Sequence, residues 1–282
     1  MSRQLLLIHG LGGGSWSWET FQRECARLGV GSLAIELPRS KQDDFENFVM
    51  YAAQALHDFQ AQHGPCVVVG HSLGGLVAQK LAETEPAAGF VFLASVPPWS
   101  LLRLAYWRLW RGLLRHPWRQ VVGPILGRKL LLDHGLQEEL LNQRLAPDVK
   151  AAIYARDRPD SGRASMQMVL GLIRVDSGRV HAPCLVVAGS DDQLMPLSEQ
   201  RRLAAYYRCP SLVFDAGHML MLEPGAAGVA RGICDWLEQI EVVVVNPGVI
   251  NETGRAGESG DGDQSSRHSF SHRQKGVAVD GG

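Results

Sequence analysis

Six short apolar runs alternate with segments of helical periodicity along most of the chain. The runs are LLLIH (5–9), SLAIEL (32–37), CVVVG (66–70), FVFLAS (90–95), CLVVAG (184–189) and SLVFDA (211–216). Their hydrophobicity is continuous rather than alternating, as in parallel strands that are covered on both faces. Apolar residues recur at helical spacing in the segments 45–62, 75–85, 197–207 and 226–240. The pattern predicts an α/β fold with a doubly wound, mainly parallel sheet and right-handed crossovers.

Two regions interrupt this alternation. Residues 99–181 contain no convincing strand and are rich in Leu, Trp and Arg, which predicts a helical cap insertion between the core segments 1–98 and 182–241. The final segment, 242–282, is predicted to be a disordered tail that catalysis does not need. From Asn246 onward it is rich in Gly, Ser and charged residues and poor in apolar ones.

Composition and charge narrow the class of protein only slightly. A chain of 282 residues with 45% hydrophobic content can bury a sizeable core. The balance of 28 basic to 29 acidic residues gives no global attraction for nucleic acid. The five cysteines are scattered without a CxxC pair, which argues against a disulfide framework and against a zinc site. The start, MSRQLLLIHG, is typical of neither a signal peptide nor a membrane span, so we expect a cytoplasmic protein.

The segment CVVVGHSLGG (66–75) holds the strongest candidate for chemistry. It predicts a strand that turns sharply into a helix and exposes the hydroxyl of Ser72 as a nucleophile, the arrangement called a nucleophile elbow. Such a strained turn crowds its own backbone, so the residues two before and two after must be small, as Gly70 and Gly74 are. The GxSxG pattern is weak alone, but its place between an apolar run and a helical segment makes it specific.

A serine nucleophile needs a histidine base and a carboxylate that orients this base. Asp191 and Asp192 follow the apolar run 184–189, and His218 follows the run 211–216. Both positions lie at predicted carboxyl ends of strands, where open α/β sheets gather their functional groups. The chain thus offers Ser, acid and His in that order.

Four motifs, LLLIHGLGG, GHSLGG, LVVAGSDDQLMP and DAGHMLMLEP, resemble those of serine members of the α/β-hydrolase fold superfamily. The resemblance is to esterases and lipases of compact form, because two strands that usually precede the HG motif are lacking. It implies a catalytic triad of Ser72 as nucleophile, His218 as general base and Asp192 as acid. Asp192 is preferred to Asp191 because the acid usually ends a GxxD turn. Metal and organic cofactors are not implied.

An oxyanion hole of backbone N–H groups is also expected. One donor is the N–H of Leu73, at the start of the helix after the nucleophile. The resemblance to the HG motif implies that the N–H of Leu11 is the other, with His9 and Gly10 shaping the loop. The glycine-rich loop also loosely resembles a dinucleotide-binding loop, but Ser15 stands where GxGxxG requires glycine.

Some positions depart from the patterns of related enzymes. Hydroxynitrile lyases carry a lysine after the catalytic histidine, whereas this chain has Met219, which favours hydrolysis. Relatives that open epoxides or displace halides use an aspartate nucleophile, which Ser72 argues against. The usual DLPGHG loop reads ELPRS at 36–40, so the resemblance does not define that rim of the pocket.

The insertion contains a stretch, 99–132, with seven basic residues and no acidic residue. The basic residues are Arg103, Arg108, Arg111, Arg115, Arg119, Arg128 and Lys129, interleaved with Trp99, Trp107, Trp110 and Trp118. Such a stretch can lie at an anionic lipid surface or admit an apolar substrate. Alternatively, it packs its aromatic residues on the core and directs its arginines to solvent. Trp16 and Trp18 likewise have two interpretations, core packing and a pocket wall.

These observations predict a serine hydrolase that cleaves a carboxylic ester with an apolar acyl or alcohol group through an acyl-enzyme. The alternatives within enzymes are a lipid acyl hydrolase at a membrane surface and a cofactor-free hydrolase of C–C or thioester bonds. Outside enzymes, the alternative is a catalytically idle scaffold that binds a partner. The expected partner is a small apolar ester, without nucleic acid and with weak membrane contact through the basic cap.

Overall fold

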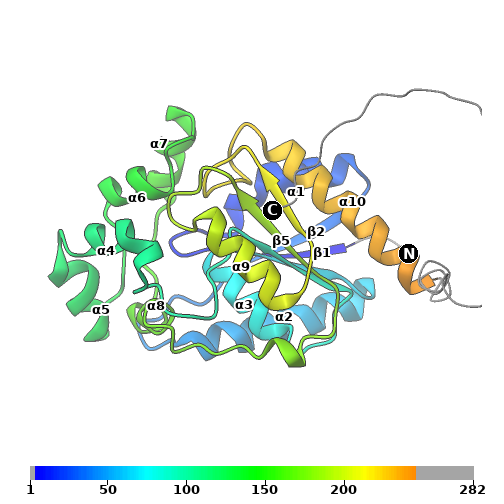
Figure 1. Cartoon of the computed structure of the whole chain (residues 1–282), viewed down its shortest axis with the longest axis horizontal. Coiled ribbons are helices and arrows are strands. Elements are labelled where there is room, and N and C mark those ends of the chain that lie inside the picture. The colour runs from blue at the N-terminus through cyan, green and yellow to red at the C-terminus, as the bar shows by residue number, and fades with distance from the viewer. Residues whose placement is uncertain (1–3, 246–282) are drawn as a thin grey trace, which may run out of the picture. The chain divides into compact units, whose positions relative to one another are not determined.

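Six strands pair into one parallel sheet within the residues that this computed structural model describes, 4–245 (Figure 1). The strands are β1 (Gln4–Ile8), β2 (Gly31–Ile35), β3 (Val67–His71), β4 (Gly89–Leu93), β5 (Cys184–Gly189) and β6 (Ser211–Phe214). Their order across the sheet is β2-β1-β3-β4-β5-β6, and every neighbouring pair is parallel. Each strand overlaps one of the six apolar runs, so the predicted doubly wound parallel fold is confirmed.

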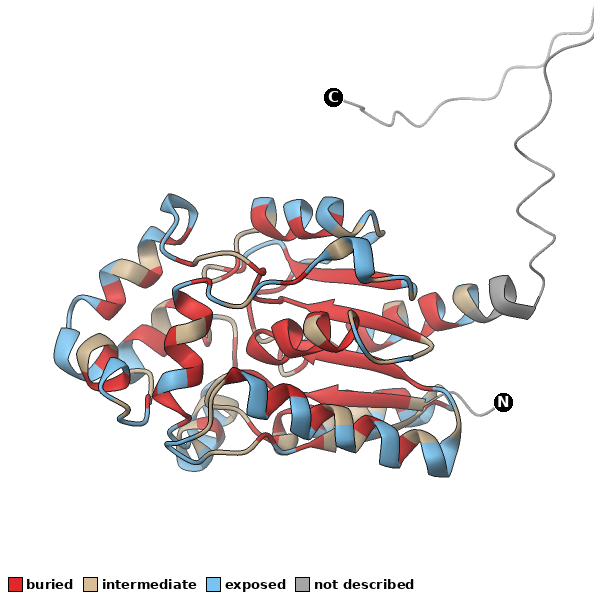
Figure 2. Ribbon diagram, turned by 90° about the horizontal axis from the view of Figure 1, so that it is seen from below, coloured by how far each residue is buried: buried red, intermediate tan, exposed pale blue. Residues whose placement is uncertain are grey.

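Helices cover both faces of the sheet, and the strands between them are largely buried (Figure 2). The covering helices are α1 (Glu19–Arg27), α2 (Phe45–His63), α3 (Leu73–Leu81), α9 (Leu197–Tyr207) and α10 (Ala226–Val245). Alternate side chains of β3 enter opposite clusters. Val67 and Val69 pack with residues of α1 and α10, whereas Val68 packs with residues of α2, α3 and α9. This two-sided burial explains the continuous hydrophobicity of the strands.

The helix limits follow local signals. Asp44 caps α2: its side chain accepts from the N–H of Asn47 at 3.2 Å, and the Asn47 side chain accepts from the N–H of Asp44 at 2.9 Å. The predicted helix 197–207 agrees with α9. The segment 75–85, with its helical periodicity, overlaps α3, which begins at Leu73, as expected of the helix after Ser72, and ends at Leu81.

The insertion, residues 99–181, connects β4 to β5 and lies beyond the carboxyl ends of the strands (Figure 1). Its α-helices are α4 (Trp107–Leu113), α5 (Gly123–Ile125), α6 (His134–Leu140), α7 (Pro147–Arg156) and α8 (Gly162–Val169). Shorter helical turns are η2 (Leu104–Tyr106), η3 (Trp118–Val122) and η4 (Ser177–Arg179). Its extended pairing is a single bridge between Leu130 and Asp160, and its other regular structure is helical.

The chain after the core differs slightly from the expectation. Helix α10 continues to Val245, past the predicted boundary at 241. The rest of the predicted disordered tail, 246–282, lies outside the described residues. Among the helices of the described part, none is both long and apolar enough to cross a membrane.

Candidate active site

Ser72 lies in a sharp turn between β3 and α3. Its backbone has φ 53° and ψ −114°, a left-handed φ that residues other than glycine rarely adopt. The N–H of Ser72 donates to the carbonyl oxygen of Leu93 at 3.0 Å, which ties the turn to β4. A strained backbone of this kind is typical of functional positions.

The glycines around Ser72 permit close backbone approach. A Cβ atom at Gly70 would lie 2.2 Å from the carbonyl oxygen of Gly74, and a Cβ atom at Gly74 would lie 2.4 Å from the carbonyl oxygens of Ile8 and His9. These distances are far below van der Waals contact, so neither position can carry a side chain. The expectation that the turn demands small residues two before and two after Ser72 is confirmed.

His218 and Asp192 meet beside this turn, at the carboxyl ends of β6 and β5. The Nδ1 atom of His218 lies 2.8 Å from Oδ2 of Asp192, and both side chains are buried. Because a carboxylate can only accept, Nδ1 of His218 carries the proton, and Nε2 is the basic nitrogen. The other carboxylate oxygen, Oδ1, accepts from the N–H groups of Leu194 at 2.9 Å and Met195 at 2.8 Å.

The neighbouring Asp191 is exposed and points elsewhere. Its carboxylate lies 3.8 Å from Arg144 and accepts from the side chain of Gln193 at 2.8 Å. Of the two adjacent aspartates, Asp192, the last residue of the GxxD turn, is therefore the one that contacts His218.

A buried carboxylate supports the loop that carries His218. Glu223 accepts the N–H of Gly217 with both oxygens, at 3.0 and 2.9 Å. Burial raises the pKa of Glu223, and Arg144, 3.5 Å away, opposes this effect. No sequence pattern predicted this role for Glu223, although it stands within the DAGHMLMLEP motif.

Two further buried histidines shape the site. The Nε2 atom of His71 donates to the carbonyl oxygen of His218 at 3.0 Å, and burial holds the pKa of His71 well below its usual value. In the loop after β1, Nδ1 of His9 donates to the carbonyl oxygen of Gly10 at 2.8 Å, and Nε2 accepts the N–H of Leu37 at 3.1 Å. Burial lowers the pKa of His9 to about 4. Both imidazoles are therefore neutral near pH 7, and both hold backbone in place.

The loop after β1 contains backbone N–H groups with and without acceptors among the described residues. The N–H of Gly12 donates to Oδ2 of Asp160 at 2.5 Å, and that of Gly13 donates to the carbonyl oxygen of Gly10 at 3.2 Å. Within residues 4–245, the N–H of Leu11 has no acceptor, and Leu11 lines the pocket. Leu73 is the first residue of α3, where an N–H group has no partner inside the helix. These are the two amides expected to face an oxyanion.

A buried ion pair holds this loop from the outside. The guanidinium of Arg39 donates to Oδ1 of Asp160 at 2.6 Å and to the carbonyl oxygen of Gly13. Burial raises the pKa of Asp160 to about 6, although Arg39 and the N–H of Gly12 both lower it. This pair was not predicted, and its only signal in the sequence is the ELPRS segment, which contains Arg39 and departs from DLPGHG.

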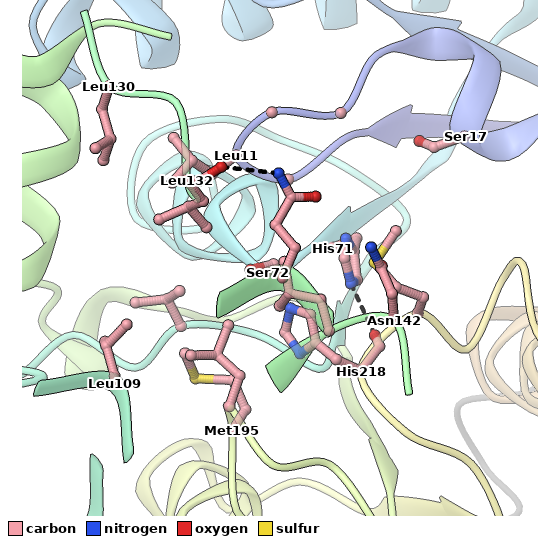
Figure 3. A pocket seen from close by; sticks show the side chains of 18 of the residues that line it. Leu11, Ser17, His71, Ser72, Leu109, Leu130, Leu132, Asn142, Met195 and His218 are labelled. Atoms are coloured by element: carbon pink, nitrogen blue, oxygen red, sulfur yellow. Dashed lines mark hydrogen bonds between the residues drawn. The ribbon is translucent and has the colours of Figure 1, made fainter. Parts of the chain in front are cut away.

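Ser72 and His218 both line one apolar pocket beneath the insertion (Figure 3). Its empty space is about 1010 Å³, the open mouth included. Most of the wall is aliphatic or methionine: Leu11, Val96, Leu101, Leu109, Leu113, Leu130, Leu131, Leu132, Leu141, Ile153, Met166, Met168, Val169, Leu194, Met195, Met219 and Met221. In the view of Figure 3, Leu109, Leu130, Leu132 and Met195 lie on one side of Ser72, and His71 and Asn142 lie on the other.

A few polar side chains interrupt this apolar wall, and the sequence analysis did not identify them. Gln137 donates to Asp157 at 2.6 Å, and Asn142 donates to the hydroxyl of Tyr154 at 3.3 Å. The two tryptophans of the first helical turn divide between the two expected roles: Trp16 lines the pocket, whereas Trp18 is fully buried in the core. The described residues contain no group of three or more His, Cys, Asp or Glu side chains arranged to hold a metal ion.

The fold and this site define a class of protein, the α/β hydrolases. Residues 5–231 match the Alpha/beta hydrolase family, and the chain belongs to it. The resemblance drawn from the four motifs is thereby confirmed.

The individual proteins to which the chain is similar share 30% or less of its sequence. The chain is similar to "Putative carbamate hydrolase RutD" of Variovorax paradoxus, with 30% identity over 194 residues that make up 65% of this chain and 68% of the relative. Its fold is similar to that of the methylesterase MES16 from Arabidopsis, with a TM-score of 0.66, 16% identity and coverage of 84% and 99% of the two chains. It is also similar to that of a monoacylglycerol lipase from Paleococcus ferrophilus, with a TM-score of 0.63, 22% identity and coverage of 84% and 94%.

Proposed function

We propose that this α/β hydrolase is a serine esterase that cleaves carboxylic esters with an apolar acyl or alcohol group through an acyl-enzyme. The observation that carries the proposal is the buried contact of His218 with Asp192 in the same pocket as Ser72, whose backbone is strained. These three groups are the nucleophile, base and orienting acid that acyl transfer requires.

The mechanism begins when Nε2 of His218 takes the proton of the Ser72 hydroxyl as its oxygen attacks the ester carbonyl. Asp192 stabilises the resulting imidazolium, and the N–H groups of Leu11 and Leu73 donate to the oxyanion. The tetrahedral intermediate then collapses, and His218 donates its proton to the departing alcohol. Water, deprotonated by His218, cleaves the acyl-enzyme and regenerates Ser72.

The neutral state of the other histidines supports this division of roles. A protonated His71 beside His218, with ring centres 4.8 Å apart, would oppose the positive charge that His218 gains in the transition state. Burial lowers the pKa of His71, which removes that repulsion. His218 is then the one imidazole of the pocket that takes up a proton.

The pocket wall supports an apolar substrate. Each additional buried methylene stabilises binding by about 0.8 kcal/mol, which is roughly a fourfold gain per carbon as long as the chain stays inside the pocket. A charged or sugar-like group would lose its hydration against the aliphatic wall without gaining enough polar partners. The esterases and the lipase among the structures of similar fold support ester hydrolysis as the reaction.

A carbamate is the second candidate substrate, favoured by the name of the curated relative. Its carbonyl is open to the same attack by Ser72, and its nitrogen could meet the polar side chains of Gln137 or Asn142, which line the same pocket.

Labelling with a fluorophosphonate probe tests the nucleophile. We expect the wild type to be labelled at Ser72, Ser72→Ala to stay unlabelled, and Ser17→Ala, which removes the other serine hydroxyl of the pocket lining, to be labelled like the wild type. A folded wild type that is not labelled would contradict the proposal.

The adjacent aspartates provide a matched pair for the acid. Asp192→Asn should lower kcat for p-nitrophenyl butyrate by roughly 10³- to 10⁴-fold, because His218 loses the partner that fixes its tautomer. Asp191→Asn should leave kcat within about twofold, because this exposed side chain does not contact His218. Parallel series of p-nitrophenyl esters and carbamates of rising chain length then decide between the two substrate classes.

A further inference from the structure

The first part of the insertion, called its outer side below, exposes an unusual number of large apolar side chains. Among the residues whose exposure is described, half of the exposed large apolar side chains lie within 102–126, and their exposure ranges from 45% for Leu102 to 85% for Leu104. They are Leu102, Leu104, Trp107, Leu114, Trp118, Ile125 and Leu126. Single exposed apolar residues are ordinary, but a concentration in one short segment is typical of an interaction site.

The same segment carries positive charge. The wider stretch 99–132 holds seven basic residues and no acidic residue, although the whole chain has a formal net charge of −1. Glu139 of α6 pairs with Arg111 and with Arg115, the latter at 2.9 Å. Among the described residues, no carboxylate lies within 4.0 Å of the other five, which are Arg103, Arg108, Arg119, Arg128 and Lys129. Guanidinium groups also lie over the exposed ring of Trp107, at 5.7 Å for Arg108 and 5.0 Å for Arg111.

Helix α4 connects this outer side to the pocket. Leu109 and Leu113, on one side of the helix, are buried and line the pocket that holds Ser72. Trp107 and Arg111, on the other side, are exposed. A surface that attracts lipid at the outer side would therefore bring it within one helix diameter of the apolar wall, about 10 Å.

We propose that the exposed apolar and basic residues of 102–129, called the insertion surface below, dock this protein on membranes that contain anionic phospholipids. Apolar side chains enter the boundary between headgroups and acyl chains, while arginine and lysine side chains bind the lipid phosphates. This combination separates a lipid surface from a second copy of this chain, which would bring the same uncompensated positive charges together. The proposal goes beyond the proposed esterase function and does not depend on Ser72.

Sedimentation with vesicles tests the docking. The full chain carrying Ser72→Ala is mixed with phosphatidylcholine vesicles, with or without 30 mol% phosphatidylglycerol, so that substrate turnover plays no part. We expect binding to the anionic vesicles, with at least about tenfold weaker binding to the neutral ones and weakening by salt, because several cationic residues contribute. Equal binding to both kinds of vesicle, or binding to neither, would overturn the proposal.

Paired variants locate the surface. Leu104→Ser with Trp118→Ser should weaken vesicle binding at least about tenfold through lost apolar contact. Met50→Ser with Tyr51→Ser, a matched exposed pair on α2, should not weaken it. Arg119→Gln with Lys129→Gln should weaken it about tenfold or more, whereas Arg201→Gln with Arg231→Gln, exposed on α9 and α10, should not.

Two further measurements control for misfolding and for self-association. With Ser72 intact, hydrolysis of a short soluble ester should be unchanged in the Leu104/Trp118 variant, because neither residue lines the pocket; a loss would show misfolding, and a milder Trp118→Tyr variant would then replace it. Light scattering without vesicles identifies the competing occupant. If the wild type self-associates and the Leu104/Trp118 variant is monomeric, the surface is an interface between copies and the membrane proposal is wrong.

The docking proposal and the esterase proposal can fail separately. A wild-type protein that has no esterase activity but still binds anionic vesicles would refute only the esterase function.

Discussion

Substituting Arg39 by Met removes the side chain that joins the loop after β1 to the insertion. In the wild type, this guanidinium lies 2.6 Å from Oδ1 of Asp160 and also donates to the carbonyl oxygen of Gly13. Oδ2 of the same carboxylate accepts the N–H of Gly12 at 2.5 Å. The ion pair thus holds the loop at two adjacent residues, Gly12 and Gly13. Arg39→Met removes the hydrogen bond to Gly13 and leaves the carboxylate of Asp160 without its cation.

The magnitude follows from charge and burial. Opposite charges about 4 Å apart attract by about 4 kcal/mol at an effective dielectric constant of about 20. The side chains of Arg39 and Asp160 are only 16% and 4% exposed, so solvent does little to replace the lost partner. Desolvation offsets part of the attraction, and the uncompensated carboxyl can protonate. We therefore expect the free energy of unfolding to fall by about 2–3 kcal/mol at pH 8. The loss should be smaller at pH 5, below the Asp160 pKa of about 6, where the wild-type carboxyl is already mostly protonated.

Catalysis should report the same change. If the N–H of Leu11 is an oxyanion donor, a looser loop aims it less well. We expect kcat for p-nitrophenyl butyrate to fall about 10- to 100-fold, with KM within about twofold, because this donor acts in the transition state. Urea denaturation at pH 5 and pH 8 and steady-state kinetics are the measurements, and Arg158→Met, which alters an exposed arginine nearby, is the control. An Arg39→Met protein with wild-type stability and kcat would refute the reasoning.

Two further predictions concern burial and close approach. Burial raises the Asp160 pKa to about 6 in the folded state, above about 3.9 in an unfolded chain. Stability from this group is therefore complete below about pH 4 and is lost as the pH rises through 6, by up to about 3 kcal/mol. Urea titrations should show this loss in the wild type relative to Asp160→Asn, and parallel pH profiles would exclude it. Gly74→Ala should lower the free energy of unfolding by at least about 2 kcal/mol, since its Cβ would lie 2.4 Å from the carbonyl oxygens of Ile8 and His9. Gly228→Ala, a helical position with open space, should instead stabilise the protein by about 0.5–1 kcal/mol in thermal unfolding, and equal effects at the two sites would contradict the argument.

The sheet and the positions of Ser72, Asp192 and His218 were predictable because their signals are local. A strand that is covered on both faces must be apolar throughout, and polar residues that follow such strands reach the same edge of the sheet. Helical periodicity after Ser72 is recognisable only from Gly75, because glycines are poor indicators of helix. Helix α3 nevertheless begins at Leu73, since the turn itself aligns the first helical residue.

Trp16 and Trp18 show where periodicity stops being informative. They stand two residues apart in a short turn of 3₁₀-helix, Ser15–Trp18, so the turn directs them to different surroundings. One lines the pocket and the other is fully buried against the sheet. The choice between core packing and pocket wall had no single answer, because each residue takes one role.

The contacts that could not be predicted join segments far apart in the chain. Arg39 and Asp160 are separated by 121 residues, and neither belongs to a periodic segment of the predicted sheet. Arg39 stands in the loop where the resemblance leads one to expect DLPGHG, at the place of a glycine. A long cationic side chain can be buried there because the insertion supplies a carboxylate to meet it. The loop that carries Leu11 is consequently held by the same segment that supplies half of the pocket lining. Exchanging the insertion for that of another hydrolase should therefore lower kcat as well as change the substrate, unless the exchanged segment restores an acidic residue opposite Arg39.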